Sequence, residues 1–428
     1  MIEPPHSFLE SLYRTAVAAA HPANCLPAHL PPLPRGRLIV LGAGKAAGSM
    51  AEIVERHYLA AGLQAARLIG LAVTRHGYSR PTRRLRVIEA GHPVPDQAGL
   101  EAAEQTLALA EQAGPDDLVL VLLSGGASAN WIAPAPGLAL ADKQATTRAL
   151  LRSGASIGEI NTVRKHLSRI KGGRLAARAR GTHLLTLAIS DVPGDDPAVI
   201  GSGPTVPDPT TLADARAIVQ FYQLDLPAGV AQALADPSNE TPKPGDSLFA
   251  RSEFRIVARS ADAFRAAEAA VRAAGLDCVF LGDRIEGEAR TIAARHAQLA
   301  RELAAHSRRT VILSGGELTV TVRGKGCGGP NQEYALALAA ALDGTQGIAA
   351  LAADTDGADG GSGGIDDPAG AFVDGSSAAR GRAIGLDPAL FLADNNSTAY
   401  FSRLDDLFLT GATFTNVNDF RAILVDST

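Results

Sequence analysis

The chain has 428 residues, of which 46% are hydrophobic and 20% are charged, and its formal net charge is −5. A chain of this length is expected to form two or three domains with substantial apolar cores. The weak negative charge, without a basic run, argues against a nucleic-acid surface, and no apolar run reaches the roughly 18 residues of a membrane span. Three scattered cysteines and no signal-peptide pattern make the reducing cytoplasm the expected compartment.

In chain order, a helix is expected over residues 7–20, followed by a Pro-rich connector over 21–36. Strand-like apolar runs then alternate with Ala-rich helical segments. The expected strands are 37–42, 66–74, 85–90, 117–126 and 182–191, and the expected helices are 44–60, 96–113, 142–153 and 161–179. Near-continuous apolar strands separated by helices indicate a mostly parallel sheet that is covered on both faces.

Residues 235–247, with the sequence ADPSNETPKPGDS, are polar and Pro-rich and form the best candidate linker. The alternation then resumes with strands at 254–260, 278–282, 310–322, 347–357 and 421–425 and helices at 261–274, 286–304, 331–342 and 376–383. We therefore expect two α/β domains, a Rossmann-like N-terminal domain over 1–240 and a C-terminal domain over 248–428. The active site is expected in the cleft between them.

The stretch LIVLGAGKAAGSMA, residues 38–51, joins an apolar strand to a helix through Gly42, Gly44 and Lys45. Its G-x-G pattern is typical of a dinucleotide site, but such a site usually places an acidic residue at the end of the second strand. Arg75 stands there instead, which disfavours NAD and leaves NADP open. Lys45 is either a solvated surface lysine or an ammonium that acts on an anion together with the helix N-terminus.

Two buried strands, one in each half of the chain, end in Ser-Gly-Gly. The first is LVLVLLSGGASAN, with Ser128 close behind, and the second is TVILSGGELTV. One interpretation is that strand-to-loop junctions simply reuse glycine. The other is that both ends point into one ligand-binding cleft, because ligands of open α/β sheets lie beyond the carboxyl ends of the strands.

Basic and polar residues provide candidate anion ligands. Arg164 and Lys171 belong to the segment INTVRKHLSRIKGGRLA, which we expect to be one basic helix with positions 164, 168 and 171 on a shared face. This helix is either a solvated surface or one wall of a site for an anionic substrate. His92 follows another strand, and Asn331 opens a helix behind a Gly-rich loop, where open backbone amides favour an anion.

Candidate metal-binding carboxylates follow two of the expected strands. Asp191 ends a strand ahead of the Gly/Ser-rich stretch 193–205, where it can hold Mg²⁺, accept a substrate proton or only cap a turn. Asp354, Asp356 and Asp359 lie in ADTDGADGGSGG, residues 353–364, which has the composition of a calcium loop without the EF-hand spacing. Carboxylates beside phosphate loops suggest magnesium–nucleotide chemistry.

Eight sequence blocks occur in a specific order: LGAGKAAGSMA, AGHPVPDQAGL, LSGGASAN, INTVRKHLSRIKGGRLA, SDVPGDDPAVIGSGPTVPDP, LSGGELTVTVRGKGCGGPNQEYALALA, ADTDGADGG and TNVNDF. From about residue 7 to the end, the chain resembles the glycerate 2-kinase family, whose C-terminal half is called the MOFRL domain. Members of this family were often labelled hydroxypyruvate reductase.

The resemblance implies two α/β domains and transfer of the ATP γ-phosphoryl group to the 2-hydroxyl of D-glycerate, with Mg²⁺. The expected partners are D-glycerate and ATP, without nucleic acid or membrane, and the chain is compatible with a homo-oligomer. The proposed catalytic lysine of the family falls on Lys45. The alternatives are an NADPH-dependent hydroxypyruvate reductase, a kinase for another small hydroxy acid, and a sensor that binds a sugar acid without ATP turnover.

From motif and chemistry we expect four groups of site residues. Lys45 and Asp191 are the expected catalytic residues, and His92, Arg164 and Lys171 the expected substrate ligands. The expected nucleotide- or phosphate-binding residues are Gly42, Gly44, Ser124, Gly125, Gly126, Ser128, Ser314, Gly315, Gly316 and Asn331. The expected metal ligands are Asp191, Asp354 and Asp356.

The chain departs from the family pattern at three places. Pro330 stands where many members have an active-site Arg, whose role could pass to Arg323 or Lys325, and Phe414 stands where the family has Gly. The block SGGASAN replaces the usual SGGGSAL. These departures leave the expected fold unchanged and bear on the choice of hydroxy acid.

Overall fold

The computed structural model describes residues 4–305, 309–361 and 366–426, and the chain forms two compact units. We call Cys25–Val257 the central unit, and Met1–Asn24 together with Ala258–Thr428 the terminal unit. This division differs from the expected domains 1–240 and 248–428. Within the described residues, no helix has both the length and the apolar character to cross a membrane.

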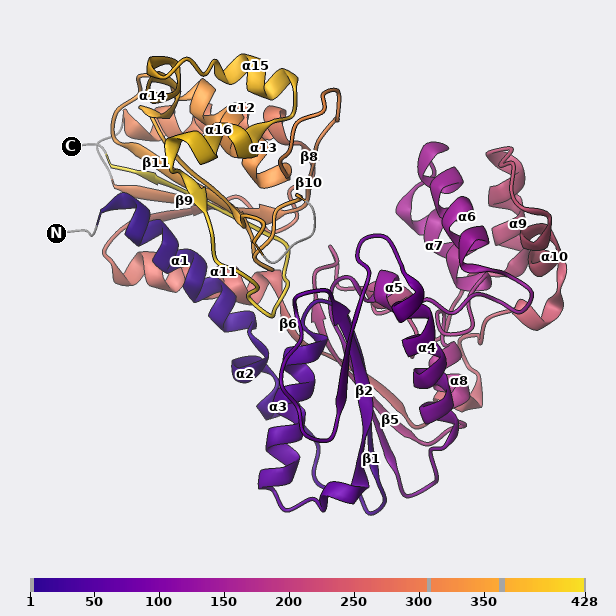
Figure 1. Cartoon of the computed structure of the whole chain (residues 1–428). Helices are drawn as coiled ribbons and strands as arrows, with labels where there is room; N and C mark the ends of the chain where they lie inside the picture. The colour runs from indigo at the N-terminus through magenta and orange to yellow at the C-terminus, as the bar shows by residue number, and fades with distance from the viewer. Residues whose placement is uncertain (1–3, 306–308, 362–365, 427–428) are drawn as a thin grey trace. The chain divides into compact units, whose positions relative to one another are not determined.

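The central unit is built on a six-stranded sheet in the order β3-β2-β1-β4-β5-β6. Its strands are β1 (Leu38–Ala43), β2 (Leu68–Arg75), β3 (Arg86–Ala90), β4 (Leu118–Leu123), β5 (His183–Ser190) and β6 (Ser252–Arg259). The pairs from β3 through β5 are all parallel, which confirms the predicted sheet. Helix α3 (Ala47–Ala60) lies on one face, and α4 (Gln97–Glu111) and α8 (Arg174–Arg178) lie on the other (Figure 1).

A small helical lobe completes the central unit (Figure 1). Its helices are α6 (Leu140–Arg152), α7 (Ile157–His166), α9 (Leu212–Phe221) and α10 (Ala228–Ala235). They share an apolar core that includes Leu150, Val163, Leu212 and Val230. The expected single helix over 161–179 is wrong: α7 ends at His166, and Gly172 and Gly173, with φ of +58° and +79°, turn the chain into α8.

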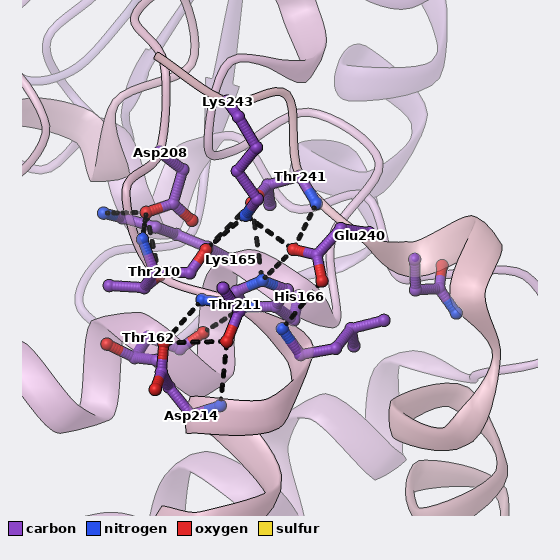
Figure 2. Close-up of polar contacts among 12 residues, drawn as sticks. Thr162, Lys165, His166, Asp208, Thr210, Thr211, Asp214, Glu240, Thr241 and Lys243 are labelled. Atoms are coloured by element: carbon purple, nitrogen blue, oxygen red, sulfur yellow. Dashed lines mark hydrogen bonds and ion pairs between the residues drawn. The ribbon is translucent and has the colours of Figure 1, made fainter.

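The segment 235–247 lies inside the central unit and is held there by a polar network (Figure 2). His166 Nε2 lies 3.1 Å from Glu240 Oε1, which in turn is 2.5 Å from Lys243 Nζ. On the same side of α7, Lys165 Nζ lies 3.4 Å from Asp208 Oδ1. The segment therefore stabilises the last turn of α7. The chain passes from one unit to the other between residues 24 and 25 and again between residues 257 and 258.

The terminal unit contains a second six-stranded sheet in the order β13-β12-β11-β14-β9-β7. Its strands are β7 (Asp277–Phe280), β9 (Thr310–Gly316), β11 (Ile348–Asp354), β12 (Gly370–Asp374), β13 (Leu407–Phe408) and β14 (Asp419–Val425). Only β7 and β9 pair in parallel, because β14 returns between β9 and β11 and runs antiparallel to both. The short strands β8 (Gly287–Glu288) and β10 (Leu318–Thr319) pair separately.

Helices cover both faces of this sheet (Figure 1). One face carries α12 (Ala289–Ala304), α13 (Pro330–Ala341), α14 (Ser377–Ala383), α15 (Pro388–Ala393) and α16 (Ser397–Leu404). The other carries α1 (Pro5–Ala20) and α11 (Ser260–Ala273), which lie side by side, and the short α2 (Pro22–Cys25) follows α1. Leu9, Leu12, Tyr13 and Ala16 form the buried stripe of α1, at the spacing of one helix face. This stripe explains why the N-terminus packs with the second half of the chain.

Candidate active site

The loops that follow β1 and β4 lie at the topological switch point of the central sheet. The two strands are neighbours in register, with Ala43 opposite Leu123, but the chain leaves them toward opposite edges of the sheet. In open α/β sheets, a crevice for ligands forms outside the carboxyl ends of the strands at such a point. Lys45 and the segment Ser124, Gly125 and Gly126 therefore occupy the position where this fold class binds ligands.

The backbone donors of the turn after β1 are already used inside the protein. Gly44 N donates to Val73 O at 3.0 Å, Lys45 N to Gly125 O at 2.8 Å, Ala46 N to Ser124 Oγ at 2.9 Å and Ala47 N to Gly44 O at 3.0 Å. A Cβ on Gly44 would collide with Ser124, and one on Gly42 would lie 3.1 Å from the Cβ of Ala72. These glycines are thus required for loop packing, and the turn does not offer the open amides of a dinucleotide cradle.

Three loops of the central unit meet around Gly126, which has φ of +86°. A Cβ on Gly126 would lie 3.1 Å from His92 Nε2 and 3.4 Å from Lys45 Cγ. The side chains of Lys45 and His92, expected from separate motifs, are therefore neighbours. Across residues 25–257, no acceptor is recorded for the backbone N–H groups of Gly125, Gly126 and Ser128, so the loop after β4 retains donors for an anion.

The loop after β4 is also fixed by residues from a distant segment. Ser128 Oγ lies 2.7 Å from Ser202 Oγ, and Lys171 Nζ donates to Ser128 O at 2.8 Å. Ser202 is fully buried with φ of +63°, a conformation that is costly away from glycine and that clusters at functional sites. Lys171 thus lies beside the predicted phosphate loop, although the helix that was expected to carry it is broken.

Arg164 lies close enough to Lys171 for its charge to influence the ionisation of the lysine. Lys171 is only 2% exposed, and burial followed by the charge of Arg164 holds its pKa well below the usual lysine value. Burial also lowers the pKa of Arg164. A buried lysine beside a half-buried arginine requires compensation, which an anionic ligand would supply.

Asp191 directly follows Ser190, the last residue of β5, and so lies at the same edge of the sheet as Lys45. The stretch after it contains Asp195, another positive-φ residue, and runs on to Ser202. Among the described residues, no group of three or more His, Cys, Asp or Glu side chains has the geometry of a metal site. Asp191 can therefore contribute at most one part of a site that substrate phosphates complete, as is common for Mg²⁺.

In the terminal unit, the predicted residues gather at one edge of the sheet. Asp419, the first residue of β14, lies opposite both Asp354 on β11 and Gly316 on β9. Asp356 N donates to Asp354 Oδ1 at 2.9 Å, which fixes the turn behind β11, and Tyr13 from α1 donates to Asp354 O at 2.9 Å. Residues 362–364 of the predicted acidic loop lie outside the described residues.

Ser314, Gly315 and Gly316 differ structurally from Ser124, Gly125 and Gly126, despite the shared sequence. They lie within β9, and Gly315 N donates to Gly282 O at 2.8 Å. A Cβ on Gly315 would run into the ring of Phe264. These contacts favour a packing role for Gly315, whereas the first Ser-Gly-Gly lies beyond its strand in a turn.

The expected anion site at the start of α13 receives an anion from the chain itself. Asp359 accepts from Asn331 N at 2.9 Å and from Gln332 N at 2.8 Å. The side-chain amide of Asn331 also donates to Asp359 and, at 2.7 Å, to Asp419. Since both amide donors of Asn331 meet carboxylates, these contacts favour a positioning role for Asn331 over phosphate binding.

This buried network contains Asp359, which the acidic loop had already offered as a candidate carboxylate, and two residues that were not expected as site residues, Asp419 and Arg421. Arg421 is 1% exposed and donates to Asp419 Oδ2 at 2.8 Å and to Gly315 O at 2.7 Å. Burial, together with the charge of Asp419, raises the pKa of Asp359 to about 7. The only sequence signal was the repeated Asp in the loop 354–359 and in TNVNDF, which does not reveal that these aspartates meet.

The two substituted family positions fit their local backbone differently. Pro330 is the first residue of α13, where its fixed φ and missing N–H carry no cost. Phe414 has φ of +59°, in the left-handed region that favours glycine and is strained for a bulky side chain. The backbone at position 414 thus favours glycine over the phenylalanine that this chain carries.

Comparison with known proteins gives the family. Residues 8–235 match the protein-family model described as a domain of unknown function (DUF4147), and residues 310–419 match the model of the MOFRL family. A protein of Agrobacterium vitis with a provisional hydroxypyruvate reductase name is 48% identical, over 97% of this chain and 94% of its own. The glycerate 2-kinase of Pyrococcus horikoshii is 38% identical, over 92% of this chain and 88% of its own.

The fold agrees over the same length. The crystal structure of glycerate kinase from Thermotoga maritima matches with a TM-score of 0.85 at 36% identity, covering 98% of this chain and 100% of that chain. The resemblance seen in the sequence blocks is therefore confirmed. The chain belongs to the glycerate 2-kinase family, which carries the MOFRL domain.

Proposed function

We propose that the chain is a glycerate 2-kinase that transfers the γ-phosphoryl group of ATP to the 2-hydroxyl of D-glycerate. Relatives named as glycerate kinases share sequence over most of the chain and the whole fold. The observation that carries the proposal is the meeting of Lys45, His92 and the loop 124–128 at the switch point of the central sheet. Phosphoryl transfer needs this combination of cations and open amides, since catalysis relies mainly on positioning and electrostatics.

Each residue of the central-unit site has a proposed task. The N–H groups of Gly125, Gly126 and Ser128 and the ammonium of Lys45 hold anionic phosphate oxygens and offset charge that develops on the transferring group. Arg164 and Lys171 bind the glycerate carboxylate. Asp191 accepts the proton of the attacking hydroxyl, and His92, beside Lys45, contacts the substrate.

The carboxylates available for Mg²⁺ are Asp191 in the central unit and Asp354 and Asp356 in the terminal unit. Their chemistry fits, because Mg²⁺ in kinases is usually bound through one or two carboxylates, water and substrate phosphates. When bound, the ion would offset the negative charge of the nucleotide phosphates. We propose either Asp191 or the pair Asp354 and Asp356 as its protein ligands.

The hydroxypyruvate reductase alternative receives less support. A reductase of this fold class would hold the pyrophosphate of NADPH on open amides after β1, yet the amides of residues 44–47 all have protein acceptors. Arg75, which could have bound the 2′-phosphate, packs over the ring of Tyr78 at 4.9 Å and is 6% exposed. Provisional reductase names among relatives do not outweigh these contacts.

The experiment is a coupled ADP-release assay with ATP, Mg²⁺ and a panel of small hydroxy acids, run beside an assay of NADPH oxidation with hydroxypyruvate. We expect the highest kcat/KM for D-glycerate and no NADPH oxidation. Preference for another hydroxy acid would correct the substrate. NADPH oxidation without ADP release would overturn the proposal, and so would D-glycerate binding without ATP turnover.

A further inference from the structure

Lys143, a residue outside every sequence motif, inserts a buried ammonium at the end of α7. Its Nζ donates to Leu167 O at 3.0 Å and to Arg164 O at 3.3 Å, and the residue is 5% exposed. These carbonyl groups lie at the last turn of α7, where a helix leaves acceptors unpaired and carries partial negative charge. Lys143 therefore caps the helix end that carries Arg164.

The charged groups that face Lys143 are all positive. Arg164 lies on α7, Lys171 lies in the turn that follows, and α10, which also packs against α6, has no charged side chain. Neighbouring cations have carboxylate partners of their own: Lys165 with Asp208, His166 with Glu240 and Arg169 with Glu104. Within residues 25–257, none of Lys143, Arg164 and Lys171 has a recorded carboxylate partner.

We call Lys143, Arg164 and Lys171 the cationic cluster. Burial, and next the charge of Arg164, lowers the pKa of Lys143 to about 7 and depresses that of Lys171 further below its usual value. Lys171 also holds Ser128 O, which joins the cluster to the predicted phosphate loop. A bound carboxylate would relieve the repulsion and restore the lysine charges.

We propose that Lys143 is a positioning residue that fixes Arg164 and gives the cationic cluster a third, titratable charge, so that a carboxylate substrate binds with uptake of a proton. The identity of that carboxylate, D-glycerate, rests on the function proposed above. The polar network around Lys165 and His166 also holds α7 in place (Figure 2), so Lys143 can be replaced while the helix remains held.

The predicted signature is a change with pH that a purely structural role would not produce. Below about pH 7 Lys143 is charged. Replacing it by methionine removes one positive charge from a site that is partly screened by solvent, and this loss should raise KM for D-glycerate about tenfold. At pH 8.5 wild-type Lys143 has lost its charge, so the wild type and Lys143→Met should bind D-glycerate with similar affinity. The KM ratio should therefore fall from about ten at pH 6 toward one, while KM for ATP changes little.

The test measures KM for D-glycerate and for ATP from pH 6 to 8.5 in the wild type, Lys143→Met and the matched control Arg152→Met, which removes an exposed cation from the same helix. A KM ratio that stays constant with pH, or an equal loss in Arg152→Met, would overturn the proposal. If Lys143→Met does not fold, calorimetry of D-glycerate binding to the wild type at pH 7.5, in Hepes and in Tris, decides. Net proton uptake supports the proposal, and zero uptake refutes it. Wild-type enzyme that binds D-glycerate with proton uptake but does not turn over ATP would refute only the proposed kinase function.

Discussion

Replacing Gly126 by alanine tests whether the three loops around it form the active site. The new Cβ would lie 3.0 Å from His92 Cδ2, 3.1 Å from His92 Nε2 and 3.4 Å from Lys45 Cγ. Ordinary carbon contacts are about 3.5 to 4.0 Å, so the imidazole must shift by roughly half an ångström. A displacement of that order in a catalytic group costs about tenfold to a hundredfold in kcat/KM.

The backbone strain of this substitution can be separated from the contact with His92. Gly126 has φ of +86°, and alanine in that region costs about 1–2 kcal/mol, partly offset by about 0.4–1 kcal/mol from the stiffer unfolded chain. Gly137 has φ of +81°, and no atom lies within 4 Å of the position that a Cβ would take there, so Gly137→Ala carries the same strain without the contact.

The assay combines ADP release per folded enzyme with urea unfolding for both variants. The unfolding free energy of both variants should fall by about 1 kcal/mol, which is the backbone strain less the gain from a stiffer unfolded chain. Only Gly126→Ala should lose activity. Equal specific activity of the two variants would refute the placement of the site at these loops.

Three further predictions concern single groups. Lys45→Ala should fold and lose at least about tenfold to a thousandfold in kcat, on the scale of one removed electrostatic stabiliser, and full activity in the ADP-release assay would remove Lys45 from the mechanism. Asp359 has a folded pKa of about 7 against about 3.9 in an unfolded chain, so the folded state binds the extra proton. Its contribution to the free energy of unfolding therefore falls by up to about 4 kcal/mol between pH 4 and 7. Urea titrations at several pH values should show a smaller fall for Asp359→Asn than for the wild type. The same dependence of unfolding free energy on pH in both proteins would contradict the buried network. Asp354→Asn should raise the Mg²⁺ concentration at half-maximal velocity, and an unchanged value would exclude that carboxylate as a metal ligand.

The elements that the sequence predicted well are those decided by local patterns. Strands β1, β4 and β5 are buried along nearly their whole length. Their ends lie within two residues of the segments expected at 37–42, 117–126 and 182–191, except that β4 ends three residues before the end of its expected segment. Those three residues, Ser-Gly-Gly, form the turn after the strand. Their phosphate-binding assignment stays a prediction that the open amides support.

The features that the sequence did not reveal depend on contacts between distant segments. A helix pattern over 161–179 could not show that Gly172 and Gly173 take positive φ and turn the chain. Nor could the Pro-rich composition of 235–247 show that Glu240 reaches His166, 74 residues away. The second sheet was likewise expected only from the alternation of strand-like and helical segments. That alternation does not indicate that β14 lies between β9 and β11.

The departures at the start of α13 have the same origin. Composition correctly indicated that helix N-terminal amides attract an anion, but the anion is Asp359 from a loop 27 and 28 residues further along the chain. Asn331 bridges two carboxylates, which favours a positioning role, and its expected phosphate-binding role stays a prediction. Local sequence indicates the chemistry of a site, whereas only the fold decides which partner satisfies it.

The most direct test of the proposed kinase activity is product identification by ³¹P NMR after incubation of the wild type with ATP, Mg²⁺ and D-glycerate, with Lys45→Ala as the control. We predict a single new resonance, that of 2-phosphoglycerate, which is absent or at least about tenfold slower to form with Lys45→Ala. Formation of 3-phosphoglycerate, or no phosphorylated product from folded wild-type protein, would contradict it.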